Sequence, residues 1–245
     1  MKKALITGAN KSIGFEAARQ LLQKGFYVYL GSRSVVNGQE AVAKLNAEGL
    51  TEVEVIQIDV SDEGSIKAAR AEIGKKTEML DVLINNAGIM GGITQSATLT
   101  DIGVYKEVFD TNFFGIVQTT QLFLDLLQAS PQPRIVNVTS GLASLSLHND
   151  PSWKYYKVKA AIYNSSKAAV NMYTISLAYE LRDTPLKVNA IDPGYTATDF
   201  NSHHGTGTVE DAAARLVKGA MLENDGPTGK FFSDDNNSDT GVSPW

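Results

Sequence analysis

Short apolar runs alternate with longer segments of helical periodicity along almost the whole chain. The apolar runs predict β-strands at residues 3–6, 27–30, 53–58, 82–84, 134–138, 187–191 and 229–232. The segments between them predict helices at residues 13–24, 38–48, 61–73, 104–129, 158–181 and 209–221. Each predicted strand is continuously apolar, which is typical of strands covered by helices on both faces. The pattern therefore predicts an α/β fold built from βαβ units around a mostly parallel sheet.

The length of 245 residues fits one large α/β domain. No repeat, low-complexity linker or block of like charge marks a boundary inside it. The polar segment 233–245 follows the last predicted strand, and we expect it to be loosely held.

Charge and composition exclude several classes of function. Lys plus Arg number 22 and Asp plus Glu number 27, which gives a net charge of −5 and no broad basic field for nucleic acid. No apolar run approaches the roughly 18 residues that cross a bilayer, and no secretory signal is seen. We therefore expect a cytoplasmic protein that binds neither nucleic acid nor membrane.

A metal site is not expected either. The chain has no cysteine and 3 histidines, so thiolate chemistry and cysteine-built zinc sites are excluded. His203 and His204 are adjacent in a Gly- and Thr-rich stretch, which is more typical of a solvated loop than of a metal site.

A glycine-rich turn follows the first predicted strand and opens the first predicted helix. It reads Thr7-Gly8-Ala9-Asn10-Lys11-Ser12-Ile13-Gly14. Small residues in such a turn let backbone N–H groups and the helix dipole face a pyrophosphate. Ser12 narrows that approach, and it is strained if the turn requires a positive φ there.

Further candidate chemistry lies in a serine and two tyrosine–lysine pairs. Ser140 follows the fifth predicted strand, and Tyr163 and Lys167 are four residues apart, so they share a helix face. A nearby cation lowers the pKa of a phenol from about 10 by at most roughly three units, toward working pH. Tyr155 and Lys159 form a second Y-x-x-x-K pair closer to Ser140.

Taken together, the motifs resemble the short-chain dehydrogenase/reductase family over about residues 3–232. They occur in the family's order: TGANKSIG, Asn85-Asn86-Ala87-Gly88, Asn112, Ser140, Y-x-x-x-K and Pro193-Gly194. TGANK followed by IGFE, with an insertion at residues 142–160, looks most like the carbonyl reductase branch. The resemblance implies one domain over residues 1–245, with a doubly wound Rossmann sheet of seven strands. It also implies reversible reduction of small ketones or aldehydes by NADPH in a homodimer or homotetramer.

The resemblance also assigns roles to the candidate catalytic residues. Tyr163 would give its proton to the carbonyl oxygen, and Ser140 would hydrogen-bond to that oxygen. Lys167 would approach the phenol and the cofactor ribose, and Asn112 would hold a water that joins Lys167 to solvent. The Ser-Lys-Ala-Ala that ends the motif around Tyr163 matches the family and favours Tyr163 over Tyr155.

The predicted cofactor contacts follow the same order along the chain. Ser12 stands where the family has a glycine. Arg33 follows the second predicted strand where an acidic residue would hold the ribose of NAD, and with Lys11 it favours a 2′-phosphate. NADP is therefore preferred, and NAD stays open if Arg33 is only solvated. The predicted set is Gly8, Asn10, Lys11, Ser12, Ile13, Gly14, Arg33, Asp59, Val60, Asn86, Ala87, Gly88, Tyr163, Lys167, Pro193, Gly194, Thr196 and Thr198.

The substrate is the least determined part of the prediction. Residues 199–210 predict a lid, and together with the insertion they would shape the substrate pocket. A 3-ketoacyl carrier-protein reductase is an alternative, although the acidic composition argues against a basic docking patch. A catalytically silent dinucleotide sensor is another alternative, favoured by Ser12 and opposed by the intact set of Asn112, Ser140, Tyr163 and Lys167.

Overall fold

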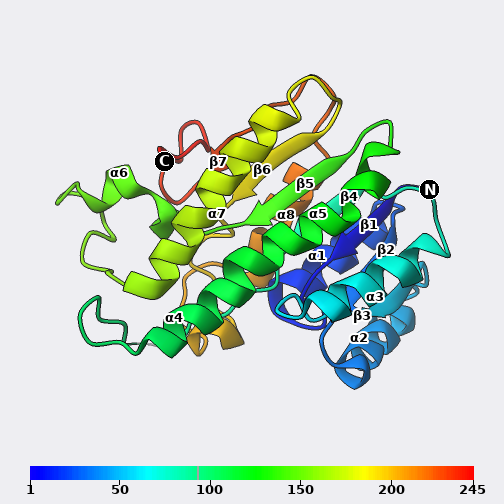
Figure 1. Ribbon diagram of the computed structural model, residues 1–245, viewed down its shortest axis with the longest axis horizontal. Helices are drawn as coiled ribbons and strands as arrows, with labels where there is room; N and C mark the ends of the chain where they lie inside the picture. Colours follow the sequence, from blue (N-terminus) through cyan, green and yellow to red (C-terminus); the bar gives the residue numbers. More distant parts are fainter. Residues whose placement is uncertain (93) are drawn as a thin grey trace.

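The computed structural model describes residues 1–92 and 94–245, and a sheet of seven parallel strands lies at its centre (Figure 1). The strand order is β3-β2-β1-β4-β5-β6-β7, and every pair of neighbouring strands runs parallel. The predicted Rossmann fold class is therefore confirmed. The strands are β1 (Lys3–Ile6), β2 (Tyr27–Ser32), β3 (Val53–Gln57), β4 (Val82–Asn85), β5 (Arg134–Val138), β6 (Lys187–Ile191) and β7 (Phe231–Phe232).

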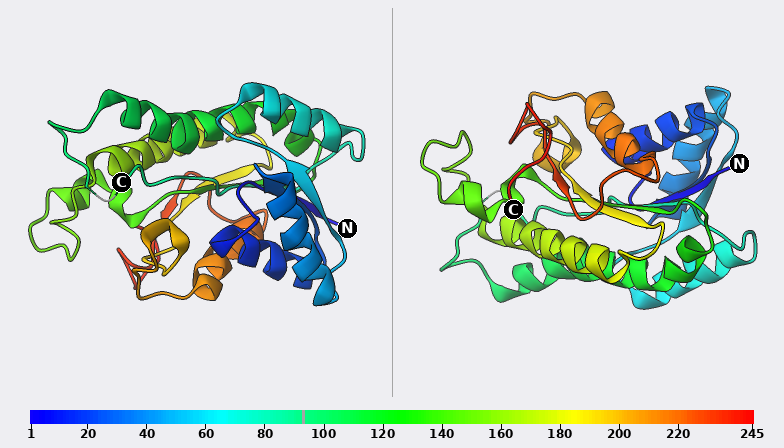
Figure 2. Two further views of the ribbon diagram at one scale, coloured as in Figure 1. Left: turned by 90° about the horizontal axis from the view of Figure 1, so that it is seen from below. Right: turned by 90° about the horizontal axis from the view of Figure 1, so that it is seen from above.

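Helices cover both faces of the sheet, as Figure 2 shows. One face packs against α1 (Ser12–Gln23), α2 (Val35–Ala47) and α8 (Val209–Ala220). The other packs against α3 (Glu63–Gly74), α5 (Gly115–Gln128) and α7 (Ala161–Glu180). Successive residues of β1 alternate between the two cores: Ala4 and Ile6 belong to the first, and Leu5 to the second. Both faces are thus apolar, which explains why the strands lack a polar alternation.

The boundaries of β2 and β7 differ from the prediction. β2 extends two residues further because Gly31 and Ser32 pair with Ile56 and Gln57 of β3. A side chain at Gly31 would lie 2.7 Å from the Ile6 carbonyl oxygen, so the close packing of β2 on β1 requires glycine there. β7 is shorter than predicted, with only Phe231–Phe232 paired to β6.

The predicted helix over residues 104–129 is present as an unbroken helical segment, but a π-helical turn interrupts its α-helical geometry. The structure has α4 (Ile102–Phe109), a π-helical turn over Asp110–Phe114, and α5. The apolar periodicity continues through all three, so it does not reveal the wider turn. Asn112 lies inside the π-helical turn, and such turns are frequent at functional sites.

The C-terminal segment is packed onto the domain, which contradicts the expectation that it is loosely held. Val242 forms an antiparallel bridge with Phe232, and the Trp245 ring lies 5.6 Å from the Phe231 ring. The Trp245 carbonyl oxygen accepts hydrogen bonds from the backbone N–H and hydroxyl of Ser146, at 3.0 and 2.7 Å. Ser146 lies in the short helix α6 (Leu145–His148), so this segment braces the region after β5.

The functional consequence of the fold lies at the carboxyl ends of β1 and β4. These neighbouring strands lead to helices on opposite faces of the sheet, α1 after β1, and α4 and α5 after β4. A crevice forms where the strand order reverses in this way, and ligands of open α/β sheets bind there. Across residues 1–92 and 94–245, no helix has both the length and the hydropathy needed to span a bilayer.

Candidate active site

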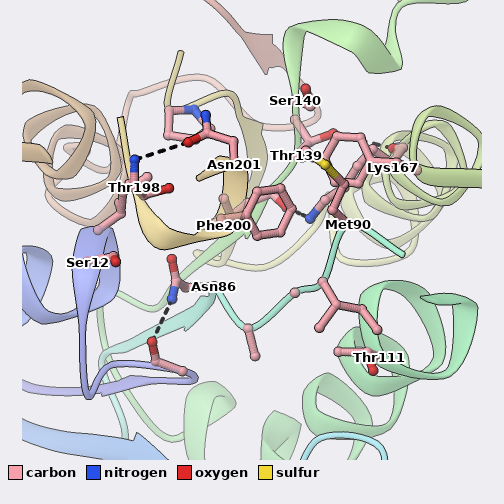
Figure 3. Close-up of a pocket in the computed structure, with 18 of the residues that line it drawn as sticks. Ser12, Asn86, Met90, Thr111, Thr139, Ser140, Lys167, Thr198, Phe200 and Asn201 are labelled. Atoms are coloured by element: carbon pink, nitrogen blue, oxygen red, sulfur yellow. Dashed lines mark hydrogen bonds between the residues drawn. The ribbon is translucent and has the colours of Figure 1, made fainter. Parts of the chain in front are cut away.

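A cleft of about 1300 Å³ opens at the carboxyl edge of the sheet. Every predicted site residue except Asn112 lines it, including residues contributed by loops after six different strands. These residues are Gly8, Asn10, Lys11, Ser12, Ile13, Gly14, Arg33, Asp59, Val60, Asn86, Ala87, Gly88, Ser140, Tyr163, Lys167, Pro193, Gly194, Thr196 and Thr198. The fold therefore brings together motifs that are scattered over most of the chain. Figure 3 shows Ser12 and Thr198 at one part of this cleft and Ser140 and Lys167 at another.

The glycine-rich turn is held against the end of β4. Asn86 donates from its side chain to the carbonyl oxygens of Thr7 and Gly8, at 2.9 and 3.1 Å. A side chain at Gly14 would lie 2.7 Å from the Gly8 oxygen, so this packing leaves no room for one. No side chain caps the N-terminus of α1 in the described part of the chain, and its first two residues, Ser12 and Ile13, line the cleft. An uncapped helix N-terminus of this kind suits a phosphate group.

Ser12 adopts the strained conformation that the sequence suggested. Its φ is 51°, in the left-handed region that favours glycine. The turn therefore has the backbone shape of a glycine turn and carries a serine side chain into the cleft wall.

Two cations lie near the turn, and one has an unexpected partner. Arg33 lines the cleft and is exposed, in agreement with a role toward a 2′-phosphate. Lys11 forms an ion pair with Asp199 at 3.1 Å, and both side chains are at least half exposed. The hydrogen bond from Lys11 lowers the pKa of Asp199. The pair connects the glycine-rich turn with the short 3₁₀ turn Asp199–Asn201 that follows Thr198.

Tyr163, Lys167 and Ser140 meet at the end of β5. Tyr163 and Lys167 lie on α7 and are 9% and 3% exposed. The Lys167 Nζ donates to the Val138 carbonyl oxygen at 2.8 Å and lies 5.9 Å from the centre of the Tyr163 ring. Ser140 lies close enough to the Tyr163 hydroxyl to act on its pKa, and its own hydroxyl accepts from the Leu142 N–H at 3.2 Å.

The second tyrosine–lysine pair does not form. Lys159 donates to the His148 carbonyl oxygen at 2.8 Å and lies 4.4 Å from the centre of the Tyr156 ring. Tyr155 lines the cleft, but its hydroxyl donates to Asp235 at 3.5 Å. The geometry thus favours Tyr163 with Lys167 as the acid–base pair.

Burial dominates the titration of this pair. It raises the pKa of Tyr163 above its ordinary value, although the neighbouring Ser140 acts in the opposite direction. Burial also lowers the pKa of Lys167 to about 8. In the chain by itself, burial sets the direction of the Tyr163 shift, while Lys167 is bound to the Val138 carbonyl, so the lowering expected from Lys167 stays a prediction.

Asn112 lies behind the cleft wall and is fully buried. Its Oδ1 accepts from the Ile89 N–H at 2.8 Å, and its Nδ2 donates to the Ile89 carbonyl at 2.9 Å and to the Ser166 hydroxyl at 3.1 Å. The side chain therefore ties the segment after β4 to α7.

Sequence reasoning missed three contributors to this cleft. Asp192, which directly precedes Pro193-Gly194, is 4% exposed and accepts from Ser233 at 2.6 Å and the Gly194 N–H at 3.0 Å. Phe200 lies over Tyr163, with ring centres 5.6 Å apart, and Met90 lines the wall after β4. Phe200 lies in the 3₁₀ turn inside the predicted lid segment 199–210, and Met90 lies in the loop after β4, so the periodicity of the sequence singles out neither side chain.

Metal chemistry has no visible support. Among residues 1–92 and 94–245, no three His, Asp or Glu side chains lie close enough together to hold a metal ion. The polar groups of the cleft are hydroxyls, amides, backbone groups and the side chains of Lys11, Arg33, Lys106 and Lys167, together with the carboxylates of Asp59, Glu107, Asp110, Asp192, Asp199 and Asp235.

Comparisons with known proteins agree with this geometry. The sequence profile of a family described as short chain dehydrogenase matches residues 2–207. The short-chain dehydrogenase anuI of Penicillium roqueforti is 38% identical over 88% of this chain and 87% of that protein. The (+)-neomenthol dehydrogenase of Capsicum annuum is 32% identical over 94% of each. Salutaridine reductase from Papaver somniferum has a similar structure, with a TM-score of 0.83, 29% identity and coverage of 96% of this chain and 100% of that one. An NADPH-bound carbonyl reductase from chicken fatty liver gives a TM-score of 0.83 at 26% identity, over 100% of this chain and 99% of that one.

The strain at Ser12 predicts the effect of Ser12→Gly. Glycine adopts a φ of 51° without the penalty that a side chain brings, so we expect the free energy of unfolding to rise by about 1 kcal/mol. We also expect a lower Kd for NADPH, because the turn loses the side chain that narrows it. Chemical denaturation and fluorescence titration with NADPH measure the two effects.

Ser202→Gly is the matched control for this experiment. Ser202 has a φ of 55° and is exposed, and it does not line the cleft. The control should gain stability and leave the Kd for NADPH unchanged. An unchanged or higher Kd in Ser12→Gly would contradict the prediction.

The lowered pKa of Lys167 predicts a pH-dependent stability. Between pH 8 and 10.5 the unfolded chain binds more protons at this residue than the folded chain does, so folding becomes more favourable as pH rises. The free energy of unfolding of the wild type, relative to Lys167→Met, should increase over this window by up to about 3 kcal/mol. Urea denaturation of both proteins at several pH values measures the difference, and a flat or falling difference would contradict the prediction.

Proposed function

Since the chain belongs to the short-chain dehydrogenase/reductase family, whose members are oxidoreductases acting on alcohol and ketone groups, we propose that it is an NADPH-dependent carbonyl reductase. One observation carries the proposal. Ser140, Tyr163 and Lys167 converge at one end of a cleft whose other end is the glycine-rich turn and Arg33. Acid–base groups and a dinucleotide cradle thus share one cavity.

The residues of the cleft fit a nicotinamide dinucleotide. Gly8 and Gly14 leave no space for a side chain at either position, the N-terminus of α1 has no side-chain cap, and the chain presents Lys11 and Arg33 nearby. These are the groups that a pyrophosphate and a 2′-phosphate require. When bound, the nicotinamide supplies the hydride that the carbonyl carbon receives.

The chain's own residues supply the proton and the geometry. The raised pKa of Tyr163 keeps its hydroxyl protonated at neutral pH, so it can give that proton to the carbonyl oxygen as the carbon takes up hydride. Ser140 hydrogen-bonds to the same oxygen and stabilises its developing negative charge. Lys167 is held by the Val138 carbonyl at the base of the tyrosine, where its positive charge favours a tyrosinate once the proton has left. The product is an alcohol, and the reverse reaction returns the proton to Tyr163.

The preference for NADPH rests on Arg33. No carboxylate follows β2 at this place, and the exposed guanidinium offers a forked pair of donors to a phosphate. Lys11 would add a second cation when a 2′-phosphate competes with Asp199 for it.

Residues 142–160 and 199–210 would form the substrate end of the cleft. Leu142, Tyr155 and Val158 of the first segment and Phe200 of the second line it. We propose that residues 1–245 form one domain, in which these two segments cover the substrate pocket. The chain would act as a homodimer or homotetramer through the long helices, where Phe114, Met172 and Tyr179 are exposed.

The choice of tyrosine is tested by comparing Tyr163→Phe with Tyr155→Phe. Each variant loses one hydroxyl from the cleft and keeps its ring. Removing a general acid typically costs about 10²–10⁴-fold in rate, and we expect that loss in Tyr163→Phe alone. The measurement follows NADPH oxidation with an aryl ketone.

The outcomes separate the alternatives. Loss of turnover in Tyr155→Phe with an active Tyr163→Phe would reverse the assignment. A wild type that binds NADPH but reduces no ketone or 3-ketoacyl thioester in the panel would favour a dinucleotide sensor, which the strained Ser12 would suit.

The cofactor preference is tested by Arg33→Ala. Loss of a charge-assisted contact worth about 1.5–3 kcal/mol should raise the Kd for NADPH by roughly 10–150-fold and leave the Kd for NADH nearly unchanged. Arg182→Ala is the control, because Arg182 is exposed beside Tyr179 and does not line the cleft. An equal change for both dinucleotides would mean that Arg33 does not read the 2′-phosphate.

A further inference from the structure

Helix α7, which carries Tyr163 and Lys167, begins without a cap from its own neighbourhood. The residue before it, Ala160, has no side-chain group that could accept the N–H groups of the first turn. These N–H groups have no partner within the helix and require an acceptor when buried. The acceptor comes from another part of the chain: the side-chain oxygen of Gln95 accepts from the Ile162 N–H at 3.0 Å and from the Tyr163 N–H at 2.8 Å.

Gln95 itself belongs to the loop between β4 and α4, and the other end of its amide binds within that loop. Gln95 Nε2 donates to the Met90 carbonyl oxygen at 2.7 Å and to the Gly92 carbonyl oxygen at 3.0 Å. The side chain is 9% exposed. A glutamine amide has two N–H donors and one oxygen with two lone pairs, so all four positions are used. The orientation of the amide follows from its partners, because the reverse orientation would place donors against donors.

Gln95 therefore links two walls of the cleft. Met90 lines the wall that continues from the Asn85-Asn86-Ala87-Gly88 motif, and Figure 3 shows it among the cleft residues. Tyr163 lines the same cleft from the first turn of α7, and its own backbone N–H is one of the two groups that Gln95 holds. The Tyr163 carbonyl oxygen accepts from the Ser166 hydroxyl at 2.8 Å, so both backbone polar groups of this residue have fixed partners.

We propose that Gln95 is a positioning residue for the reaction. By holding the first turn of α7, it sets the distance between Tyr163 and the wall of the cleft that Met90 lines. The inference rests on the proposed function, in which Tyr163 transfers the proton. A local Ser, Thr or Asp cap would satisfy the same N–H groups, but it would not connect them to the Met90 carbonyl. A displacement of about 1 Å at a reacting group can cost about 10²-fold in rate, so a link of this kind affects catalysis without touching substrate.

Two variants separate positioning from a simple contribution to stability. Gln95→Met keeps the length of the side chain and removes all four hydrogen bonds. Gln95→Glu keeps the acceptor for α7, loses both donors to the loop, and places a negative charge near the first turn of α7. Gln128→Met, at the exposed end of α5, is the matched control.

The first measurement is steady-state kinetics with NADPH and an aryl ketone on folded protein, together with the pH profile of alcohol oxidation. We expect kcat to fall at least tenfold, and toward 10²-fold, in Gln95→Met, with the Kd for NADPH within twofold of the wild type. Gln95→Glu should lose less activity, and the pH at which oxidation begins should shift upward because the added charge raises the pKa of Tyr163. A wild-type kcat in folded Gln95→Met, or an unshifted profile in Gln95→Glu, would overturn the proposal.

The second measurement does not depend on activity. Hydrogen exchange of the first turn of α7 should accelerate in Gln95→Met and stay at the wild-type rate in Gln128→Met, because the Ile162 and Tyr163 N–H groups lose their acceptor. If the wild type reduces no ketone, the proposed function fails, while this exchange still decides the link. Unchanged exchange in Gln95→Met would overturn the link even if the enzyme is active.

Discussion

The position of α7 on the sheet depends on a ladder of buried polar side chains. Asn85 of β4 donates to Thr120 of α5 at 3.0 Å and to Asn137 of β5 at 2.9 Å, and Asn137 donates in turn to Thr174 of α7 at 2.9 Å. Two residues further on, just past the end of β5, Thr139 donates to Asn171 of α7 at 2.8 Å. Apolar packing alone would let a helix slide or rotate with modest loss, whereas each of these bonds fails if α7 shifts by part of a turn. A missing partner for a buried polar group costs about 1–3 kcal/mol, so the ladder selects one placement of the helix.

The site follows from that placement, because Lys167 lies one turn before Asn171 and Tyr163 one turn before Lys167. The ladder fixes the middle of α7 against β5, and the Lys167 bond to the Val138 carbonyl continues it toward the cleft. Closer to its N-terminus, α7 is held by contacts to segments other than β5. Ser166 connects the helix with Asn112, and Gln95 connects its first turn with the loop after β4. A tyrosine at the end of a helix would otherwise have the freedom of a frayed terminus.

The sequence predicted the layers of the fold and most of the cleft for a physical reason. Continuous apolar strands and helical periodicity indicate that both faces of the sheet are buried. Glycine-rich and Pro-Gly turns indicate the local backbone conformation. Each of these signals is carried by residues close together in the sequence. What it missed depends on contacts between distant segments. The π-helical turn around Asn112 keeps the apolar period, the capping of α7 comes from residue 95, and the ion pair of Lys11 with Asp199 joins residues 188 positions apart. The effect of burial on the Tyr163 pKa was also missed, because spacing places a lysine near a phenol but does not say how dry both become.

Burial shifts the pKa values of Tyr163 and Lys167 in opposite directions, and both shifts favour the neutral form of the side chain. It raises the pKa of the phenol and lowers that of the ammonium to about 8, so it favours the neutral form of each. A protonated tyrosine can give a proton to a carbonyl oxygen, and a lysine that has little water around it interacts strongly with any charge that develops beside it. The same desolvation that makes tyrosinate costly before the reaction thus strengthens its attraction to Lys167 during it. That attraction falls with distance. The contacts that hold α7 therefore determine how strongly Lys167 stabilises the negative charge on the Tyr163 oxygen.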